Sequence, residues 1–415
     1  MKLIMVITRK VFLLLCCLTA LYTAKAQKSA FDYSFYGFVR GDYYVNSRSN
    51  VEGVDGLFYL FPKDVAKDAE GKDLNATPNG SFYSFTTRFG IDMKGPDVGA
   101  ARTTAKVETD LGGTNNMQFM LRIRHAYLRL AWQGGSTLTM GQTWHPLFGE
   151  VAPNILDLST GSPFQPFNRS PQISYQYANS GFKFTAAALW QLIYLTVGAE
   201  GKSEKYIKDG VLPELYAGLD YKADNWLVGG GVDMTSIKPR LQSVMSGKTY
   251  KVDERLTGFS YDLHAKYSTK DFSVSAKSVL AENQTHTTMI GGFGVSAIDP
   301  VTGQQDYVPF RHSTSWLNLV YGSKYQSSLF AGYTKNLGTS KSLTVADNVY
   351  GLGLDIDRFV NISYCLRYVL PHWHLGLEYT LSTAWYGAIN PASGKVNDTH
   401  DVTNHRLSSV FMYFF

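Results

Sequence analysis

The sequence predicts an all-β protein: a 16-stranded antiparallel up-and-down transmembrane β-barrel with short periplasmic turns, long extracellular loops and a third loop folded into the lumen. Three observations lead to this fold class. A basic and apolar leader marks the chain for export. Beyond the leader there is no run of the roughly 18 or more apolar residues that a spanning helix needs. Apolar and polar residues instead alternate with a period of two, as in strands with one apolar face.

Residues 1–26 have the three parts of a secretory signal peptide. A basic start is followed by an apolar stretch over residues 11–21 and by Ala24-Lys25-Ala26, the small-residue pattern that signal peptidase accepts. We expect cleavage before Gln27. The mature chain, residues 27–415, is then expected to lie in the bacterial outer membrane as an integral barrel.

The charge and cysteine content exclude several protein classes. The leader contains four of the 39 Lys and Arg residues and none of the 34 Asp and Glu residues, so the mature chain has 35 bases against 34 acids. A generally basic protein that binds nucleic acid is therefore disfavoured. Two of the three cysteines also lie in the leader. Cys365 alone cannot form an internal disulfide, and we assign it no role.

The alternation that is typical of strands extends through the chain. In residues 82–94, one set of alternate residues is mainly aromatic or aliphatic, and the other includes Arg88 and Asp92. Residues 101–110 and 373–382 repeat this pattern. The predicted strands begin near residues 33, 82, 101, 119, 136, 172, 182, 214, 226, 257, 272, 313, 325, 358, 373 and 403.

The connections between these strands alternate in length. The first long loop spans residues 46–81 and the third spans residues 145–171. With short and long connections in turn, both chain ends lie on the short-turn side. An even number of strands also closes the sheet without exposed edges, as lipid requires. The short connections lie near residues 95–100, 133–135, 178–181, 223–225, 268–271, 322–324 and 371–372.

The aromatic residues support a membrane barrel. All seven Trp residues fall near predicted strand ends, and six of them, all except Trp316, are predicted to face the apolar side. Two aromatic girdles at the membrane interfaces would produce this distribution. The chain also closes on Phe415, with further aromatic residues at alternate positions before it, as in bacterial outer-membrane barrels. A soluble β-sandwich or propeller is the alternative, but its strands would bury their apolar face against a second sheet.

Residues 145–171 contain five of the 14 prolines in the chain. Because proline fixes φ and has no N–H donor, we expect this segment to hold one shape without joining the strand ladder. A stiff loop at this position is expected to fold inward and narrow the lumen. The alternative is a rigid extracellular loop.

The polar faces of the first four strands place many charges in the lumen. The fourth strand changes phase near His125, which predicts a β-bulge there. We expect arginines on the wall to face acids of the third loop, so that the field orients dipolar solutes and the excess of arginine favours anions. The alternative is a set of solvated charges, each neutralised by a neighbouring acid. The predicted constriction residues are Arg40, Arg88, Lys106, Arg122, Arg124, Glu150 and Asp157.

Six ordered motifs between residues 37 and 173 resemble the DcaP-like trimeric porins, whereas the likeness is weak beyond residue 177. The resemblance implies a 16-stranded homotrimeric porin that has its third loop in the lumen and takes up small, mainly anionic solutes. Some relatives have a long N-terminal stalk. Only a few residues separate Gln27 from the first strand here, so a function tied to such a stalk is not expected. The motifs are Gly37-Phe38-Val39-Arg40, Arg88-Phe89-Gly90-Ile91-Asp92, Lys106-Val107-Glu108-Thr109-Asp110, Arg122-Ile123-Arg124-His125-Ala126-Tyr127, Gly141-Gln142-Thr143-Trp144 and Arg169-Ser170-Pro171-Gln172-Ile173.

The sequence favours a passive outer-membrane channel for small hydrophilic solutes. It has no nucleophile elbow, metalloprotease motif, P-loop or dinucleotide-binding motif, so we expect no enzyme activity, no cofactor and no bound metal. A barrel hydrolase would need a nucleophile beside His264 or His405, and no motif supplies one. A receptor or adhesin that acts through its long loops is the other alternative. The expected partners are further copies of the chain, outer-membrane lipid and lipopolysaccharide, and small anionic or polar solutes such as carboxylates.

Overall fold

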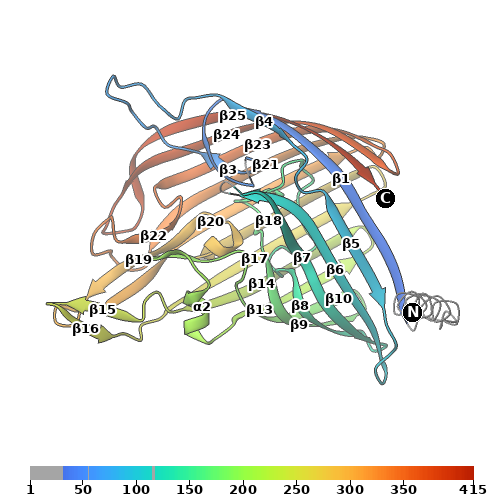
Figure 1. Cartoon of the computed structure of the whole chain (residues 1–415), viewed down its shortest axis with the longest axis horizontal. Helices are drawn as coiled ribbons and strands as arrows, with labels where there is room; N and C mark the ends of the chain where they lie inside the picture. Colours follow the sequence, from blue (N-terminus) through green and yellow to red (C-terminus); the bar gives the residue numbers. More distant parts are fainter. Residues whose placement is uncertain (1–30, 55, 115–116) are drawn as a thin grey trace, which may run out of the picture.

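The computed structural model describes residues 31–54, 56–114 and 117–415. Over these residues the chain forms a closed antiparallel barrel (Figure 1), which confirms the predicted fold class. The barrel closes because β1 pairs with β25 on one side and with β4 and β5 on the other. The signal peptide predicted for residues 1–26 lies outside the described residues.

In chain order the wall consists of β1 (Asp32–Asn46), β4 (Asn79–Tyr83) continued by β5 (Arg88–Lys94), β6 (Ala101–Thr114), β7 (Met117–Trp132), β8 (Ser136–Trp144), β9 (Arg169–Asn179), β10 (Phe182–Leu189), β13 (Glu214–Ala223), β14 (Trp226–Ile237), β17 (Leu256–Ser268), β18 (Phe272–Glu282), β20 (Gln305–Tyr321), β21 (Tyr325–Thr339), β23 (Ile356–Val369), β24 (Trp373–Ile389) and β25 (Val396–Phe414).

The second wall strand is broken, whereas the sequence predicted one strand over residues 82–94. Its two parts, β4 and β5, pair with different halves of β1. The break includes Thr86, whose φ of 65° lies in the left-handed region and cannot continue a strand. Two backbone hydrogen bonds to β6 hold the break in place: Thr86 N–H donates to the Leu111 carbonyl at 2.6 Å, and Leu111 N–H donates to the Thr87 carbonyl at 3.1 Å.

Several strands at the loop end of the barrel begin earlier than predicted. β20 begins at Gln305 rather than near 313, and β25 begins at Val396 rather than near 403. The added part of β20 pairs with β19 (Gly291–Ile298), which pairs in turn with β22 (Val349–Leu352). The sheet therefore continues into the loops beyond the wall. The loops also contain β2 (Asn50–Gly53) with β3 (Phe58–Pro62), β11 (Val197–Gly198) with β12 (Gly201–Lys202), β15 (Gln242–Met245) with β16 (Lys248–Lys251), helix α2 (Lys205–Gly210) and the 3-10 turn η1 (Thr285–Thr287).

The outer face of the wall is apolar and open. Phe35, Leu263 and Tyr325 are each more than 70% exposed, and alternate residues of the wall strands follow the same pattern. Nothing among the described residues covers this face, which a soluble sandwich would bury against a second sheet. No helix in the described part of the chain is long and apolar enough to cross a membrane.

Trp144 differs from the sequence prediction, which placed six of the seven tryptophans on the apolar outer face. Its ring stacks on Phe148 at 4.0 Å and packs against the buried cluster inside the barrel. The change of side follows Gly141, whose φ of 126° interrupts the regular alternation of β8. Trp316 lies inside the barrel, as predicted.

The predicted β-bulge in the fourth wall strand is present. In the β6–β7 pair, Glu108 lies opposite His125 but Thr109 lies opposite Ile123, so Arg124 is the extra residue. A bulge rotates the following residues by one position. Both Arg124 and His125 are therefore buried inside, and the apolar residues on either side still face outward.

The long connection between β8 and β9, residues 145–168, is called loop 3 below. It ends three residues earlier than predicted, because β9 begins at Arg169 and Pro171 lies opposite Gln142 in the ladder. Pro171 has no N–H to donate to the ladder, but its carbonyl still accepts a hydrogen bond from Trp190 N–H at 2.9 Å.

Candidate pore and constriction

Loop 3 lies inside the barrel and binds the wall on several sides. The Leu156 carbonyl accepts a hydrogen bond from the Arg40 guanidinium of β1 at 2.8 Å. The Leu156 N–H donates to the Glu378 carboxylate of β24 at 2.8 Å. Asn154 donates its N–H to the side chain of Asn318 on β20 at 2.9 Å. Contacts to strands this far apart in the sequence are possible only from within the lumen, so the predicted inward fold of the loop is correct.

The second half of the loop is held by aromatic packing. The Phe164 ring stacks on Phe359 of β23, with ring centres 5.0 Å apart, and lies over Gly332 of β21. Trp316 of β20 donates its indole N–H to Gln165 at 3.0 Å. These residues are almost completely buried, so loop 3 and the wall of β20–β23 form one packed core that reduces the open part of the lumen.

The wall opposite this core carries the predicted arginines. Arg122 bonds Asp110 at 2.9 Å, Arg124 bonds both Glu108 and Asp110 at 2.7 and 2.9 Å, and Arg88 lies 3.5 Å from Glu108. Three guanidinium groups therefore share two carboxylates. The acid side chains are almost fully buried, while the three arginines keep between 9% and 24% exposure.

Arg169 joins this group from β9 and was not among the predicted site residues. It is 4% exposed and has no carboxylate partner among the described residues. Its guanidinium lies over the Trp144 ring at 4.5 Å and donates to the Tyr194 hydroxyl at 2.7 Å. With Arg88, Arg122 and Arg124 it forms the arginine cluster, in which four positive charges face the two negative charges of Glu108 and Asp110.

The other two predicted bases are neutralised locally. Arg40 bonds Asp42 at 2.6 Å, and Lys106 lies 3.1 Å from Asp92 and donates to the Tyr36 hydroxyl at 3.0 Å. Both pairs lie on the lumen side of the first wall strands. They add little to the net field because each positive charge has an adjacent negative one.

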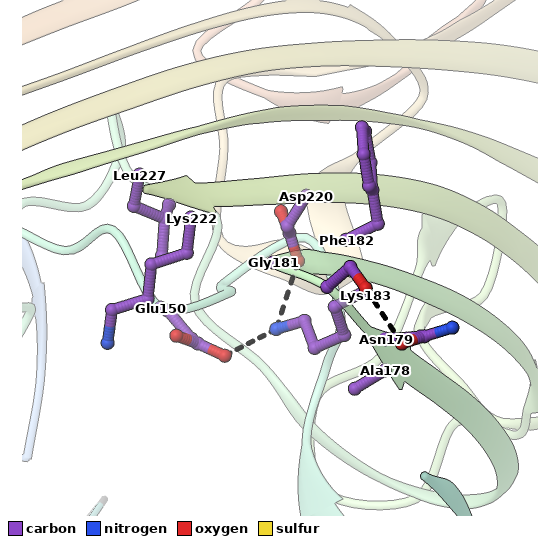
Figure 2. Close-up of a pocket in the computed structure, with 10 residues that line it drawn as sticks. Glu150, Ala178, Asn179, Gly181, Phe182, Lys183, Asp220, Lys222 and Leu227 are labelled. Atoms are coloured by element: carbon purple, nitrogen blue, oxygen red, sulfur yellow. Dashed lines mark hydrogen bonds and ion pairs between the residues drawn. The ribbon is translucent and has the colours of Figure 1, made fainter. Parts of the chain in front are cut away.

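The two predicted loop acids do not face the arginines. Figure 2 shows that Glu150 binds Lys183 of β10, which also bonds Asp220 at 2.9 Å. Asp157 is buried and lies 3.4 Å from Arg406 of β25. The sequence could not assign these partners, because they depend on which part of the wall the loop reaches.

Further acids on the inner side of the barrel come from β13, β14 and β17. Sequence reasoning did not select them, although they occupy the polar set of alternate residues in their strands. A cavity of about 180 Å³ in the lumen is lined by Arg129, Trp144, Asp220 and His264, among others. Asp220 bonds Lys183 and His264 beside this cavity, whereas the other acids of these three strands do not line it. The acids are Glu214, Asp220, Asp233 and Asp262.

His264 has no role as a catalytic base in this arrangement. Its Nδ1 lies 2.7 Å from Asp262 and its Nε2 lies 2.8 Å from Asp220. Because each ring nitrogen of His264 faces a carboxylate oxygen, both nitrogens carry an N–H. No lone pair of the ring is then free to accept a proton from a nucleophile. His405 faces outward and bonds the Tyr379 hydroxyl.

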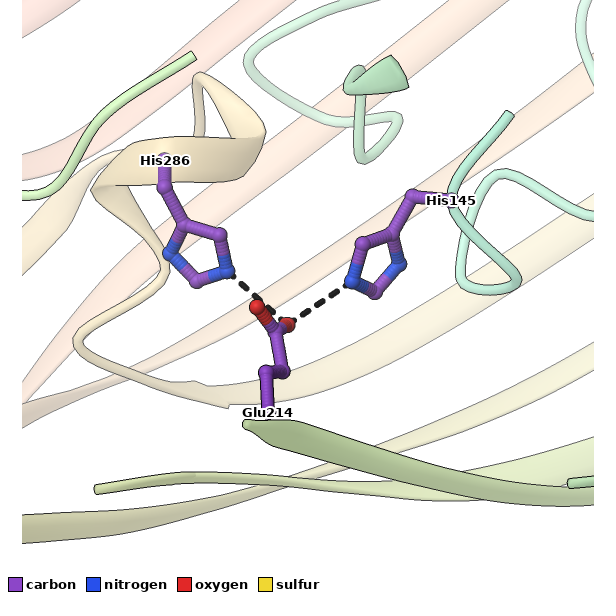
Figure 3. Close-up of side chains that lie close together, drawn as sticks. All are labelled: His145, Glu214 and His286. Atoms are coloured by element: carbon purple, nitrogen blue, oxygen red, sulfur yellow. Dashed lines mark hydrogen bonds and ion pairs between the residues drawn. The ribbon is translucent and has the colours of Figure 1, made fainter. Parts of the chain in front are cut away.

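His145, Glu214 and His286 form a fully buried group whose ligand atoms lie within 4.8 Å of one another (Figure 3). The two imidazole Nε2 atoms lie 2.7 and 2.9 Å from one carboxylate oxygen, Glu214 Oε1. A histidine that binds a metal through Nε2 normally donates its Nδ1–H to an acceptor. His145 Nδ1 instead accepts the Leu147 N–H at 3.1 Å, and His286 Nδ1 has no partner in the described part of the chain.

This proton arrangement does not fit a metal centre. The nitrogen to oxygen distances are also those of ordinary hydrogen bonds. We therefore assign the three residues as a hydrogen-bonded group in which one carboxylate oxygen accepts from two imidazoles, and call it the His–Glu–His clasp.

The structure is similar to solved outer-membrane channels. It matches the outer membrane channel DcaP of Acinetobacter baumannii with a TM-score of 0.66 and 20% identity, over 94% of this chain and 99% of that one. It matches the trimer form of OmpT, an outer membrane protein of Vibrio cholerae, with a TM-score of 0.56 and 13% identity, over 93% and 100%. The anion-selective porin from Comamonas acidovorans matches with a TM-score of 0.54 and 11% identity, over 93% and 100%.

No protein-family model matches the sequence, and a search of curated proteins finds no relative. The similarity is therefore one of fold. In each of these three comparisons the match covers more than nine-tenths of both chains. The resemblance inferred from the six sequence motifs is confirmed at this level, because DcaP is among the structures matched. The chain has the fold of the outer-membrane porins.

Proposed function

We propose that the protein is an outer-membrane porin, a passive diffusion channel for small hydrophilic solutes that prefers anions such as small carboxylates. It would work as a homotrimer in contact with outer-membrane lipid and lipopolysaccharide. Three observations support the channel: the closed barrel, its apolar outer face and the porin fold of its structural neighbours.

The arginine cluster supports the preference for anions. It contains four guanidinium groups and two carboxylates, and Arg169 has no acid partner among the described residues. In a narrow lumen, water screens charge less than in bulk, so an excess of two positive charges favours anions and opposes cations. Arg129 and Asp220 line one lumen cavity, and charges of both signs in one lining would orient dipolar solutes.

A double variant, Arg88→Gln with Arg122→Gln, tests the preference. It removes two positive charges from the lumen side while Arg124 still bonds Glu108 and Asp110. One unit charge beside a narrow water path changes a permeation barrier by about 1 kcal/mol, or roughly fivefold in relative permeability. The measurement is the zero-current potential across a planar bilayer with a KCl gradient.

In the native protein the zero-current potential should have the sign expected of a channel that prefers chloride to potassium. In the double variant most of this potential should be lost. Lys72→Gln with Lys205→Gln is the matched control, because these lysines are 75% and 68% exposed in loops outside the wall. Cation preference in the native protein, or an equal potential in the arginine variant, would refute the proposed selectivity.

A further inference from the structure

Three basic side chains lie on the outer side of the wall, near its loop end. They are Arg311 of β20, Lys335 of β21 and Arg358 of β23, and these strands are neighbours in the wall (Figure 1). The residues directly before and after each of the three are buried, so the alternation of the strand turns each base outward. By contrast, the outward positions of β13, β14 and β17 hold no charged side chain. We call the three residues the outer basic patch.

Lys335 and Arg358 lie at the height expected of lipid headgroups. They are opposite each other in the β21–β23 ladder, ten residues from the pair Tyr325 and Tyr368 at the short-turn end. At about 3.4 Å per residue and a strand tilt of about 40–45°, ten residues rise roughly 25 Å along the barrel axis. This rise equals the height of the apolar band of an outer-membrane barrel. Both bases therefore lie where the lipid chains end and the headgroups of the outer leaflet begin.

The outer basic patch has more positive than negative charge. Two bases that are directly opposite each other on one face of a sheet repel. One acid lies between Lys335 and Arg358: an Asp357 oxygen is 2.7 Å from the Lys335 ammonium and 3.8 Å from the Arg358 guanidinium. Arg311 forms no ion pair with any residue that the structure describes. The patch therefore has three positive charges and one adjacent negative charge.

Two further acids border the patch, one on each side. Glu282 of β18 lies opposite Arg311, and its carboxylate accepts the Phe259 N–H at 3.0 Å. Asp401 of β25 lies opposite Trp385 of β24, one strand beyond β23. Neither acid forms an ion pair with a base of the patch among the described residues. The positive charge is thus confined to three strands, a width of about 10 Å, which suits a single headgroup.

Apolar and aromatic side chains continue the patch toward the centre of the membrane. The Arg358 guanidinium lies over the Trp385 ring at 4.5 Å. Tyr333, the next outward residue of β21, is 45% exposed, and Ile362 lies on the same side of β23 with equal exposure. Tryptophan and tyrosine are typical of the membrane interface. A ligand that fits this surface has phosphate at one end and acyl chains at the other.

We propose that the outer basic patch binds the phosphorylated headgroup of lipid A, the membrane anchor of lipopolysaccharide. Phosphate accepts several charge-assisted hydrogen bonds from guanidinium and ammonium groups. The sugar headgroup of lipid A is bisphosphorylated, so it can occupy three bases more fully than the single phosphate of a phospholipid. The inference rests on the proposed function, because it requires the barrel to lie in the outer membrane. In the wall, β20, β21 and β23 lie away from β6, so the expected trimer leaves the patch open to lipid.

Lipid binding to the purified, delipidated protein in detergent tests the site. The probes are bisphosphorylated lipid A, monophosphorylated lipid A and phosphatidylglycerol, and the bound fraction is measured by native mass spectrometry. We expect bisphosphorylated lipid A to bind most tightly, roughly tenfold more tightly than phosphatidylglycerol. Added salt should weaken its binding, because salt screens charges that are exposed to water.

Paired variants separate the charge of the patch from its shape. Arg311→Gln with Arg358→Gln removes two positive charges but keeps the contact between Lys335 and Asp357, so the strands should stay paired. Binding of lipid A should weaken at least roughly tenfold. Arg311→Lys with Arg358→Lys keeps both charges and should retain most of the affinity.

The matched control is Lys72→Gln with Lys205→Gln, which removes the same charge from exposed loop positions and should bind lipid A as the native protein does. The mobility of each variant in unheated gels shows that its barrel is folded.

The inference is overturned if the native protein binds phosphatidylglycerol as tightly as bisphosphorylated lipid A, since the surface would then accept any anionic lipid. It is also overturned if the double glutamine variant keeps the native affinity for lipid A. Lipid binding does not depend on conduction, so the two proposals can fail separately. A protein that binds lipid A at the patch but passes no ion current would contradict only the porin function. A conducting protein without this binding would contradict only the lipid A site.

Discussion

Phe164 of loop 3 lies in a space that the wall leaves open only because residue 332 is glycine. A Cβ atom at Gly332 would lie 2.6 Å from the Phe164 ring, which is closer than real contacts allow. The same ring stacks on Phe359 of the neighbouring strand β23 with an interplanar angle of 9°. A single missing methyl group therefore helps to set how closely loop 3 approaches the wall.

Gly332→Ala should displace Phe164 and destabilise the protein. Overpacking a core of this kind costs about 1–3 kcal/mol. The free energy of unfolding can be measured by urea titration in detergent, with the folded barrel detected by its mobility in unheated gels. Gly134→Ala is the matched control, because an added Cβ in this turn after β7 meets nothing within 4 Å. Equal stability of the two variants would show that the Phe164 contact does not constrain the loop.

The lumen core is built from loops rather than from wall strands alone. The β2–β3 hairpin of the first long loop packs on loop 3, with Phe58 and Phe167 ring centres 5.0 Å apart. Tyr386 of β24 donates to the Pro62 carbonyl at 2.6 Å and fastens the hairpin to the wall. The first loop, predicted to span residues 46–81, therefore contributes β2 and β3 to the barrel interior and the start of β4 to the wall, and only part of it extends beyond the loop end.

Removal of residues 150–165, with a short flexible bridge in their place, should raise the unit conductance. These residues fill the part of the lumen between the arginine cluster and β20–β23, so their loss widens the water path. The measurement is single-channel recording of a variant that retains its folded mobility in unheated gels. Removal of the β15–β16 hairpin, residues 242–251, should leave the conductance near the native value. An unchanged conductance after the first deletion would place the narrowest point elsewhere.

The outer surface differs around the barrel. On β6 the outward residues include Thr103, Ala105 and Thr109, whereas most other strands present large apolar side chains such as Leu263 of β17, which is 71% exposed. Small and polar side chains are poor neighbours for lipid tails and allow a second wall to approach closely. We expect the outer face around β6 to be the subunit interface.

A trimer should therefore be observed in detergent, by unheated electrophoresis and by mass photometry. Ala105→Trp should convert it to monomers, because the large ring prevents close approach of the walls. Leu263→Trp, on the lipid-facing side, should leave the trimer intact. A monomer in both measurements of the native protein would exclude the proposed assembly, and a trimer in the Ala105→Trp variant would place the interface on another side.

The sequence by itself determined the wall of the barrel. Apolar and polar residues alternate along each strand, and this alternation predicts which residues face lipid and which face the lumen. It is a local property of each strand. The bulge at Arg124 was predictable for the same reason, since the alternation changes phase at that residue. The lumen positions of Arg88 and Arg122 also follow from strand parity alone.

Only the tertiary structure decided how the lumen is filled. Glu150 binds Lys183 and Asp157 lies beside Arg406, although the sequence suggested that both acids face the arginine cluster. The same holds for the His–Glu–His clasp, whose histidines come from two different loops. Loop partners are set by the path of the backbone through a closed barrel, which brings residues more than 100 positions apart into contact, and no local periodicity encodes that path.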